Sequence, residues 1–174
     1  MITYIFSIII LFVSLFGFWS DPFFNSCTFS PSLMKNNYNE TIRRTLFYSL
    51  VHVHWLHLIM NLFTFFILGC RIESTVGSSN YLRIIILASI ITPLFTYFYH
   101  VNTKNYHSVG FSGITSCLMT LGLFICPSWI FILWCIIAMA EYIFFKKDWI
   151  AQEIHISGHV LGIILGLLFN IFHL

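Results

Sequence analysis

The sequence predicts an all-α membrane protein, a bundle of six transmembrane helices, from three observations. Of the 174 residues, 59% are hydrophobic and only 8% are charged, whereas a soluble domain of this size carries far more charge on its surface. Apolar runs of about 20 residues, the length that crosses a bilayer, recur along the chain. The polar stretches between them are short, so the chain has room for one membrane domain and for no sizeable soluble domain.

The apolar runs define the expected helices in order. Residues 2–19 lack the basic segment and the small-residue cleavage site of a signal peptide, so we interpret them as a first spanning helix. Residues 20–46 are polar and are expected to form a loop with some structure of its own. The five further helices are expected at residues 47–68, 81–100, 112–126, 128–145 and 154–171.

Glycine and proline mark the expected breaks. Gly69 is a plausible end for the second helix. Pro93 lies inside the third helix, where a neighbour must satisfy the carbonyl that it frees. Pro127 separates the fourth helix from the fifth.

Cysteine usage and charge argue against several classes of site. The five cysteines are scattered without a CxxC pair, so we expect neither a disulfide framework nor a zinc knuckle. The formal charge of +2, with no basic run, gives no indication of a nucleic-acid partner.

Polar side chains inside the second helix are the first candidates for function, because each must be compensated in a bilayer. His57 and Asn61 are four residues apart and so share one helix face. Both can donate a side-chain hydrogen bond, and together they could hold a developing negative charge. The alternative is that they hydrogen-bond to a neighbouring helix.

Ser112 lies in Gly110-Phe111-Ser112-Gly113 at the start of the fourth helix. The glycines allow close approach of the backbone, and free N–H groups at a helix start suit an oxyanion. Ordinary packing of small residues is the alternative interpretation.

The sixth helix carries a histidine beside a glycine ridge. Gly158, Gly162 and Gly166 recur every four residues, which lets a neighbouring helix come very close. His159 lies at the edge of this ridge, and His155 lies one turn earlier on nearly the same face. The alternative here is a hydrogen-bonded packing histidine.

Together these residues predict a nucleophilic site. A serine nucleophile needs a base that removes its proton and donors that hold the oxyanion. The second, fourth and sixth helices all enter the membrane from the same side, so Ser112, His57 and His159 are expected at a similar depth.

Three motifs in the same order and spacing resemble the rhomboid family of intramembrane serine proteases over about residues 43–170. They are His52, His57 and Asn61 in His-x-x-x-x-His-x-x-x-Asn, then Gly110-Phe111-Ser112-Gly113, then His-x-x-Gly-x-x-x-Gly in the sixth helix. Arg44, Glu73 and Gly77 are similar to further family positions.

The resemblance implies a single rhomboid-like membrane domain over residues 1–174 and a Ser–His dyad without a carboxylate. Ser112 would attack the transmembrane segment of a membrane-protein substrate, and His159 would be the base. His57, Asn61 and the Ser112 backbone N–H would form the oxyanion hole. The lipid bilayer and transmembrane substrates are the implied partners, and no metal, cofactor or nucleic acid is implied.

The sequence departs from the family pattern at two points. The histidine motif fits both His155 and His159; we choose His159 because it follows the small Gly158, whereas His155 follows bulky Ile154. Many family members carry a tyrosine one turn after the serine, and this chain has Ser116 there, which puts the rate in doubt.

Two other functions remain open from the sequence. The first is a catalytically inactive rhomboid-like protein that binds transmembrane clients; such proteins typically lack the serine or the histidine, and both are present here. The second is a metal site or metal transporter built from the helix histidines, although HEXXH is absent. Those histidines are His52, His54, His57, His155 and His159. The sequence does not identify the substrate or the membrane.

Overall fold

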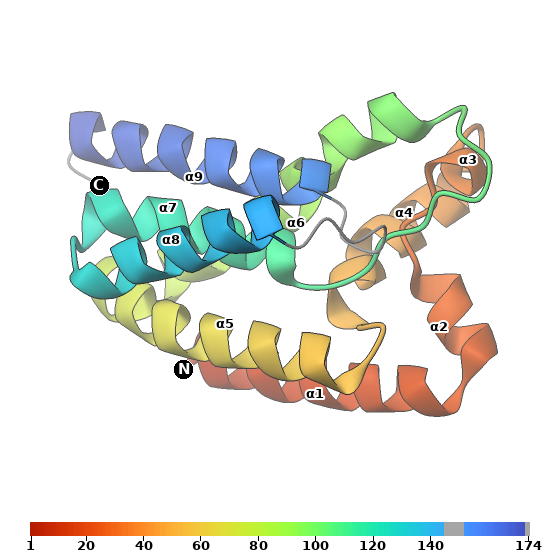
Figure 1. Cartoon of the computed structure of the whole chain (residues 1–174), viewed down its shortest axis with the longest axis horizontal. Helices are drawn as coiled ribbons and strands as arrows, with labels where there is room; N and C mark the ends of the chain where they lie inside the picture. The colour runs from red at the N-terminus through yellow and green to blue at the C-terminus, as the bar shows by residue number, and fades with distance from the viewer. Residues whose placement is uncertain (145–151, 173–174) are drawn as a thin grey trace.

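In the computed structural model, which describes residues 1–144 and 152–172, six apolar helices pack into one bundle (Figure 1). They are α1 (Ile2–Trp19), α5 (Trp55–Val76), α6 (Ser78–His100), α7 (Ser112–Ile125), α8 (Trp129–Phe144) and α9 (Gln152–Phe172). By length and composition α1, α5, α6 and α9 can each cross a membrane, while α7 and α8 are shorter apolar helices. The predicted all-α membrane bundle is confirmed.

The polar stretch after α1 has structure of its own, as expected. It contains α2 (Asp21–Cys27), α3 (Pro31–Met34) and α4 (Tyr38–Phe47), gathered at one end of the molecule (Figure 1). Pro22 and Pro31 lie in the first turns of α2 and α3, where their missing N–H groups cost nothing. Buried Arg44 donates to Glu40 and to the Thr28 carbonyl, which ties α4 to the segment after α2.

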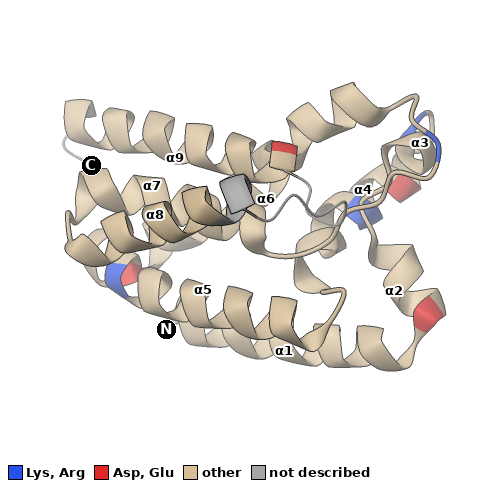
Figure 2. Cartoon of the chain, in the orientation of Figure 1, with Lys and Arg blue, Asp and Glu red and all other residues tan. Residues whose placement is uncertain are grey.

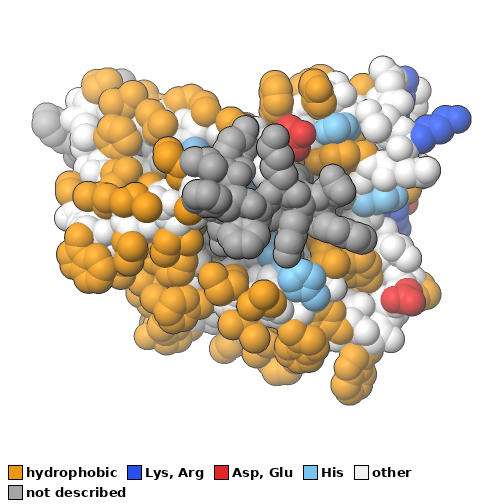
Figure 3. Space-filling view, in the orientation of Figure 1, with side chains coloured by type: hydrophobic (Ala, Val, Ile, Leu, Met, Phe, Trp, Pro, Cys, Tyr) orange, Lys and Arg blue, Asp and Glu red, His pale blue; other side chains and the backbone are white. Residues whose placement is uncertain are grey.

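Charged residues lie at the ends of the bundle and in this polar segment (Figure 2). Large apolar side chains cover much of the face shown in Figure 3. Many of them are exposed on the helices that can span a membrane, for example Phe12, Leu56 and Phe98. An exposed apolar band of this kind faces lipid rather than water.

The prediction for the second helix is wrong at both ends. Residues 48–50 form a 3₁₀ turn (η1, Tyr48–Leu50) and α5 begins only at Trp55, because the His54 side chain caps its first turn. At the other end α5 continues past Gly69 to Val76. Gly69 is instead a packing position, since a Cβ there would lie 2.2 Å from the Tyr81 hydroxyl.

The true end of α5 is at Gly77, whose φ of +80° suits glycine. Glu73, in the last turn, is buried and accepts hydrogen bonds from the Ile2 and Thr3 N–H groups and from the Ser78 hydroxyl. The Glu73 carboxylate therefore accepts hydrogen bonds from the first turn of α1 and from the first residue of α6. This compensation explains how a polar segment stays helical where a loop was predicted.

Pro93 lies inside α6, as predicted, and a neighbour does supply the missing hydrogen bond. Proline cannot donate to the carbonyl four residues earlier. The Tyr48 hydroxyl lies 3.4 Å from that Ser89 carbonyl oxygen and 3.1 Å from Thr92 Oγ1. The buried Tyr48 thus connects η1 to the middle of α6.

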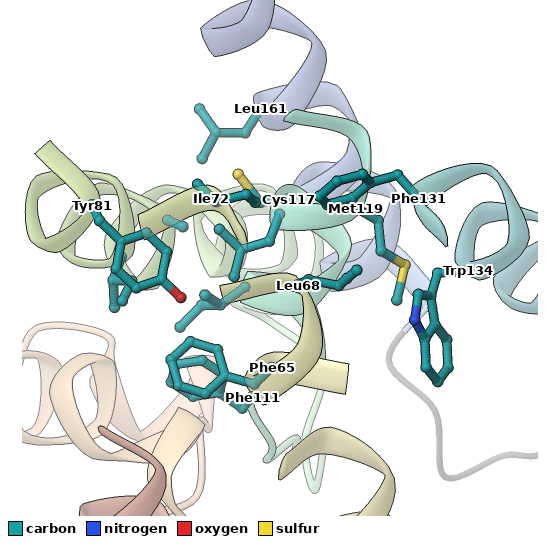
Figure 4. Close-up of a cluster of buried hydrophobic side chains, with 14 of the residues drawn as sticks. Phe65, Leu68, Ile72, Tyr81, Phe111, Cys117, Met119, Phe131, Trp134 and Leu161 are labelled. Carbon is teal, nitrogen blue, oxygen red and sulfur yellow. The ribbon is translucent and has the colours of Figure 1, made fainter. Parts of the chain in front are cut away.

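The first helix has the predicted bounds, and the described ends of the remaining helices differ from the prediction by at most three residues. The predicted end of the fifth helix at residue 145 and the loop at residues 146–151 lie outside the described residues. At the centre of the bundle is α7, whose residues from Gly113 to Gly122 are all buried. The main apolar core contains Phe65, Phe111 and Cys117 (Figure 4), so the chain just before Ser112 is anchored in it.

Candidate active site

Ser112 is the first residue of α7, and its side chain meets a histidine of α9. The Oγ atom of Ser112 lies 2.7 Å from Nε2 of His155, and both residues are only partly buried. The distance is typical of a strong hydrogen bond to a hydroxyl. A serine and an imidazole in this arrangement have the geometry of a nucleophile and its general base.

The expectation that His159 would meet Ser112 is wrong, because the glycine ridge sets a different register between α7 and α9. The two helices run parallel: Gly158 lies against the Gly113 carbonyl, and Gly162 lies against the Cys117 carbonyl and Thr120. This register places His155 level with Ser112, and it places His159 one turn deeper.

His159 lies beside the α7 backbone further along the same seam. Its own carbonyl accepts a hydrogen bond from Thr120 Oγ1 at 3.0 Å. Its ring Nδ1 is buried and has no hydrogen-bond partner among the described residues. Ser116 is buried at the same level, where a Cβ on Gly158 would lie 3.0 Å from the Ser116 Cβ. The small Ser116 therefore leaves room for the close approach of α9.

The ridge itself confirms the predicted close approach. A Cβ added at Gly158 would lie 2.2 Å from the Gly113 carbonyl oxygen, and one at Gly162 would lie 2.3 Å from the Cys117 carbonyl oxygen. Real Cβ atoms do not approach a backbone oxygen so closely, so both positions require glycine. We chose His159 because the small residue Gly158 precedes it. Gly158 is small because it packs against α7, so its size does not indicate which histidine meets the serine.

His57 lies beside the loop that leads to Ser112. Gly110 has a φ of +115°, and a Cβ there would lie 2.6 Å from the His57 Cε1 atom. The imidazole therefore packs directly against the chain two residues before the serine. Its approach depends on Gly110 having no side chain.

Asn61 shares the His57 face of α5, but part of its donor capacity is already used. Its Nδ2 atom donates to the His57 carbonyl at 2.9 Å, and the residue is buried. An amide nitrogen carries two hydrogens, so one remains for another acceptor. One of the two Asn61 donors is therefore engaged within its own helix.

Comparison with known protein families identifies the family of the chain. A family model described as Rhomboid domain matches residues 39–174, most of the chain. The chain belongs to the rhomboid family. Rhomboid proteins are typically intramembrane serine proteases, and this member is an integral, multi-pass membrane protein. No curated protein matches the chain.

The loop before the rhomboid serine is held by His52, a residue of the histidine–asparagine motif, and by Tyr48, which belongs to none of the three motifs. The Gly110 N–H donates to the Tyr48 carbonyl at 2.9 Å, and the Phe111 N–H donates to Nε2 of His52 at 3.4 Å. The first N–H of α7 that donates to a backbone carbonyl is that of Ile114, which donates to the Phe111 carbonyl at 3.0 Å. The Ser112 N–H therefore lies before the first hydrogen bond of the helix.

His52 and His54 have structural positions that explain them. His54 is exposed, and its Nδ1 accepts from the His57 N–H at 3.1 Å, which caps α5. A polar residue just before an apolar helical run was the available signal for this cap. His52 is fully buried; burial, reinforced by His57 and His54, holds its pKa well below the usual value, so the ring is neutral.

Metal ligation finds no support in the described part of the rhomboid chain. Residues 1–144 and 152–172 contain no group of three or more His, Cys, Asp or Glu side chains that could hold a metal ion. The roles found for His52, His54 and His155 are hydrogen bonds to protein groups.

Proposed function

We propose that this rhomboid protein is an intramembrane serine endopeptidase that cleaves transmembrane segments with a Ser112–His155 dyad. The observation that carries the proposal is the 2.7 Å contact between Ser112 Oγ and His155 Nε2. His155 replaces His159 as the base, because only its ring meets the serine.

The reaction follows from general acid–base chemistry. His155 Nε2 takes the Ser112 proton as Oγ attacks the scissile carbonyl carbon, and the carbonyl oxygen becomes an oxyanion. The protonated imidazole then gives this proton to the leaving amine, and the acyl group stays on Oγ. Water, deprotonated by His155, attacks the acyl carbon and releases the carboxylate and free Ser112.

We propose three donors for the oxyanion. The Ser112 N–H lies at the start of α7, before its first helical hydrogen bond. The His57 ring packs against Gly110, and Asn61 retains one amide hydrogen. Removing a single donor of this kind typically lowers turnover by about 10²–10³-fold.

The length of α7 supports a reaction below the bilayer surface. Its 14 residues extend about 21 Å, less than the roughly 30 Å of bilayer hydrocarbon. A helix this short cannot reach both surfaces, which is consistent with a nucleophile at an end that lies inside the membrane.

Labelling with a fluorophosphonate, which reacts with activated serines, tests the proposal. In the detergent-solubilised protein we expect labelling at Ser112, loss of labelling in His155→Ala, and near-normal labelling in His159→Ala. Ser116→Ala is the matched control, because it removes a buried serine of the same helix that the dyad does not use.

A second assay separates cleavage from binding. With a transmembrane peptide as substrate, Ser112→Ala should abolish cleavage and keep binding. A folded wild type that binds the peptide but neither labels nor cleaves would instead establish an inactive, client-binding rhomboid. Labelling that survives His155→Ala and disappears in His159→Ala would return the base to His159.

A further inference from the structure

A chain of hydrogen bonds connects α1 to the loop that carries the serine. The Phe111 N–H, immediately before Ser112, donates to Nε2 of His52 at 3.4 Å. On the other side of the ring, His52 Nδ1 lies 2.9 Å from Ser14 Oγ. Ser14 Oγ in turn lies 2.8 Å from the Leu50 carbonyl oxygen.

The direction of every hydrogen bond in this chain is determined. A backbone N–H can only donate, so Nε2 of His52 must be the acceptor and cannot carry a hydrogen. The neutral ring then carries its hydrogen on Nδ1, which donates to Ser14 Oγ. The Ser14 hydroxyl hydrogen is left to donate to the Leu50 carbonyl, which can only accept.

We propose that Ser14 of α1 is a positioning residue for the Ser112 site, because it holds His52 in the Nδ1–H tautomer that accepts from Phe111. In the other tautomer Nε2–H would face the Phe111 N–H, two donors would oppose each other, and the peptide before the nucleophile would shift. This inference rests on the proposed function, since it assigns Ser14 a part in orienting Ser112.

Because Ser14 and His52 are buried, the Ser14 hydroxyl is difficult to replace as the hydrogen-bond partner of His52. Ser14 and His52 are both completely buried, so water does not replace a lost partner easily. Ser14 also lies outside residues 39–174, where the family model matches. In Figure 1, α1 lies beside α5, so this helix contributes to the site from outside the matched region.

The tautomer can be measured without any activity. In full-length protein with ¹⁵N-labelled histidine, the imidazole nitrogen shifts report which nitrogen is protonated, and His52→Gln identifies the His52 signals. We expect the Nδ1–H tautomer in the wild type and a mixture of tautomers in Ser14→Ala. An Nε2–H tautomer in the wild type overturns the proposal.

Fluorophosphonate labelling then tests the consequence for Ser112. Ser14→Ala should slow labelling about tenfold, the effect of one lost buried hydrogen-bond partner, and Ser14→Thr, which keeps the hydroxyl, should restore it. Ser7→Ala is the matched control, because Ser7 also lies on α1 but donates only to the Thr3 carbonyl of its own helix.

The two readouts separate the possible failures. Unchanged labelling and an unchanged tautomer in Ser14→Ala refute the positioning role while the proposed function stands. A wild type with the Nδ1–H tautomer that never labels refutes the proposed function while the hydrogen-bond chain stands. If Ser14→Ala does not fold, the wild-type tautomer and the Ser14→Thr labelling rate still test the positioning role. An Nε2–H tautomer in the wild type would refute it, and normal labelling in Ser14→Thr would support it.

Discussion

The two sides of Ser112 are built by opposite means. On the α9 side, glycines bring two backbones into direct contact, and the position of His155 follows from a steric register. On the α5 side, the loop before the serine is held by directional hydrogen bonds to Tyr48 and His52. A steric register tolerates no added atom, whereas a hydrogen-bonded loop tolerates changes that keep its donors and acceptors.

This difference predicts which substitutions affect the stability of the fold and which affect the chemistry of the site. A methyl group in the α7–α9 seam must push two helices apart and therefore affects the whole fold. A change in the loop shifts only the peptide at residues 110–112 and therefore affects chemistry before stability. Each prediction below tests this division, beginning with the largest expected effect.

Gly162→Ala should break the seam. The added Cβ would lie 2.1 Å from Thr120 Oγ1 and 2.3 Å from the Cys117 carbonyl oxygen, so the helices must separate. We expect a loss of about 3 kcal/mol in the free energy of unfolding, at the upper end for overpacked cores, together with loss of labelling. Thermal unfolding in detergent measures the first effect.

Gly166→Ala is the control for this prediction. The atoms nearest to its Cβ would be side-chain atoms of Phe124, the ring at 2.6 Å and the Phe124 Cβ at 2.7 Å, and not backbone oxygens. Its Tm should fall much less than that of Gly162→Ala. Equal Tm values for the two variants would contradict a rigid seam around Gly162.

Gly110→Ala should damage chemistry more than stability. The Cβ would lie 2.6 Å from His57 Cε1 and displace the imidazole, which we propose as an oxyanion donor. We expect labelling to slow about 100-fold, the effect of one lost oxyanion donor. The rate of fluorophosphonate labelling, with Tm measured in parallel, checks this.

Gly77→Ala isolates the backbone component of that change. Gly77 also has a positive φ, +80°, but a Cβ there has no atom within 4 Å. Both variants lose a similar 1–2 kcal/mol or so from left-handed backbone, and only Gly110→Ala should lose labelling. If Gly77→Ala slows labelling equally, the effect arises from backbone strain and not from His57.

Lowering the pH should reduce the free energy of unfolding through His52, on the α5 side of Ser112. The pKa of His52 in the folded protein is lowered by burial below the ordinary value of about 6.5 that it has when unfolded. Below that pH the unfolded state binds more protons, so stability falls as the pH falls, by up to about 1.4 kcal/mol per pH unit.

Unfolding measured at pH 7.5 and at pH 5.5 tests this sign. His52→Gln lacks the titrating ring and should lose less stability between the two pH values than the wild type does. His54→Gln, at an exposed position beside His52, is the control and should keep most of the acid sensitivity. A wild type that gains stability in acid would exclude a neutral buried His52.

Thr120→Val should have the smallest effect. The variant keeps the shape of the seam and removes the hydroxyl that lies 3.0 Å from the His159 carbonyl oxygen and 3.3 Å from the Ser116 and Cys117 carbonyl oxygens. We expect a loss of about 1 kcal/mol with normal labelling, measured by unfolding in detergent. A loss as large as that of Gly162→Ala would show that the seam depends on polar contacts rather than on close packing.

Local rules predicted much of the fold and failed where distant groups intervene. Pro93 was correctly placed inside a helix, because hydropathy outweighs one missing hydrogen bond when Tyr48 compensates for it. Gly69 was wrongly interpreted as a helix end, because the sequence does not show that Tyr81 packs against it. The polar turn after it stays helical through the contacts of Glu73 with α1 and α6.

The sequence by itself determined that this protein is a helical membrane protein of the rhomboid type, and it predicted a serine, two histidines and an asparagine as the candidate site residues. Hydropathy and motif spacing are local properties, so they can be read along one chain. Only the tertiary structure decided that His155 rather than His159 meets Ser112, and that Ser14 contacts His52. Both depend on the register between separate helices, which is set by close packing and not by neighbours in the sequence.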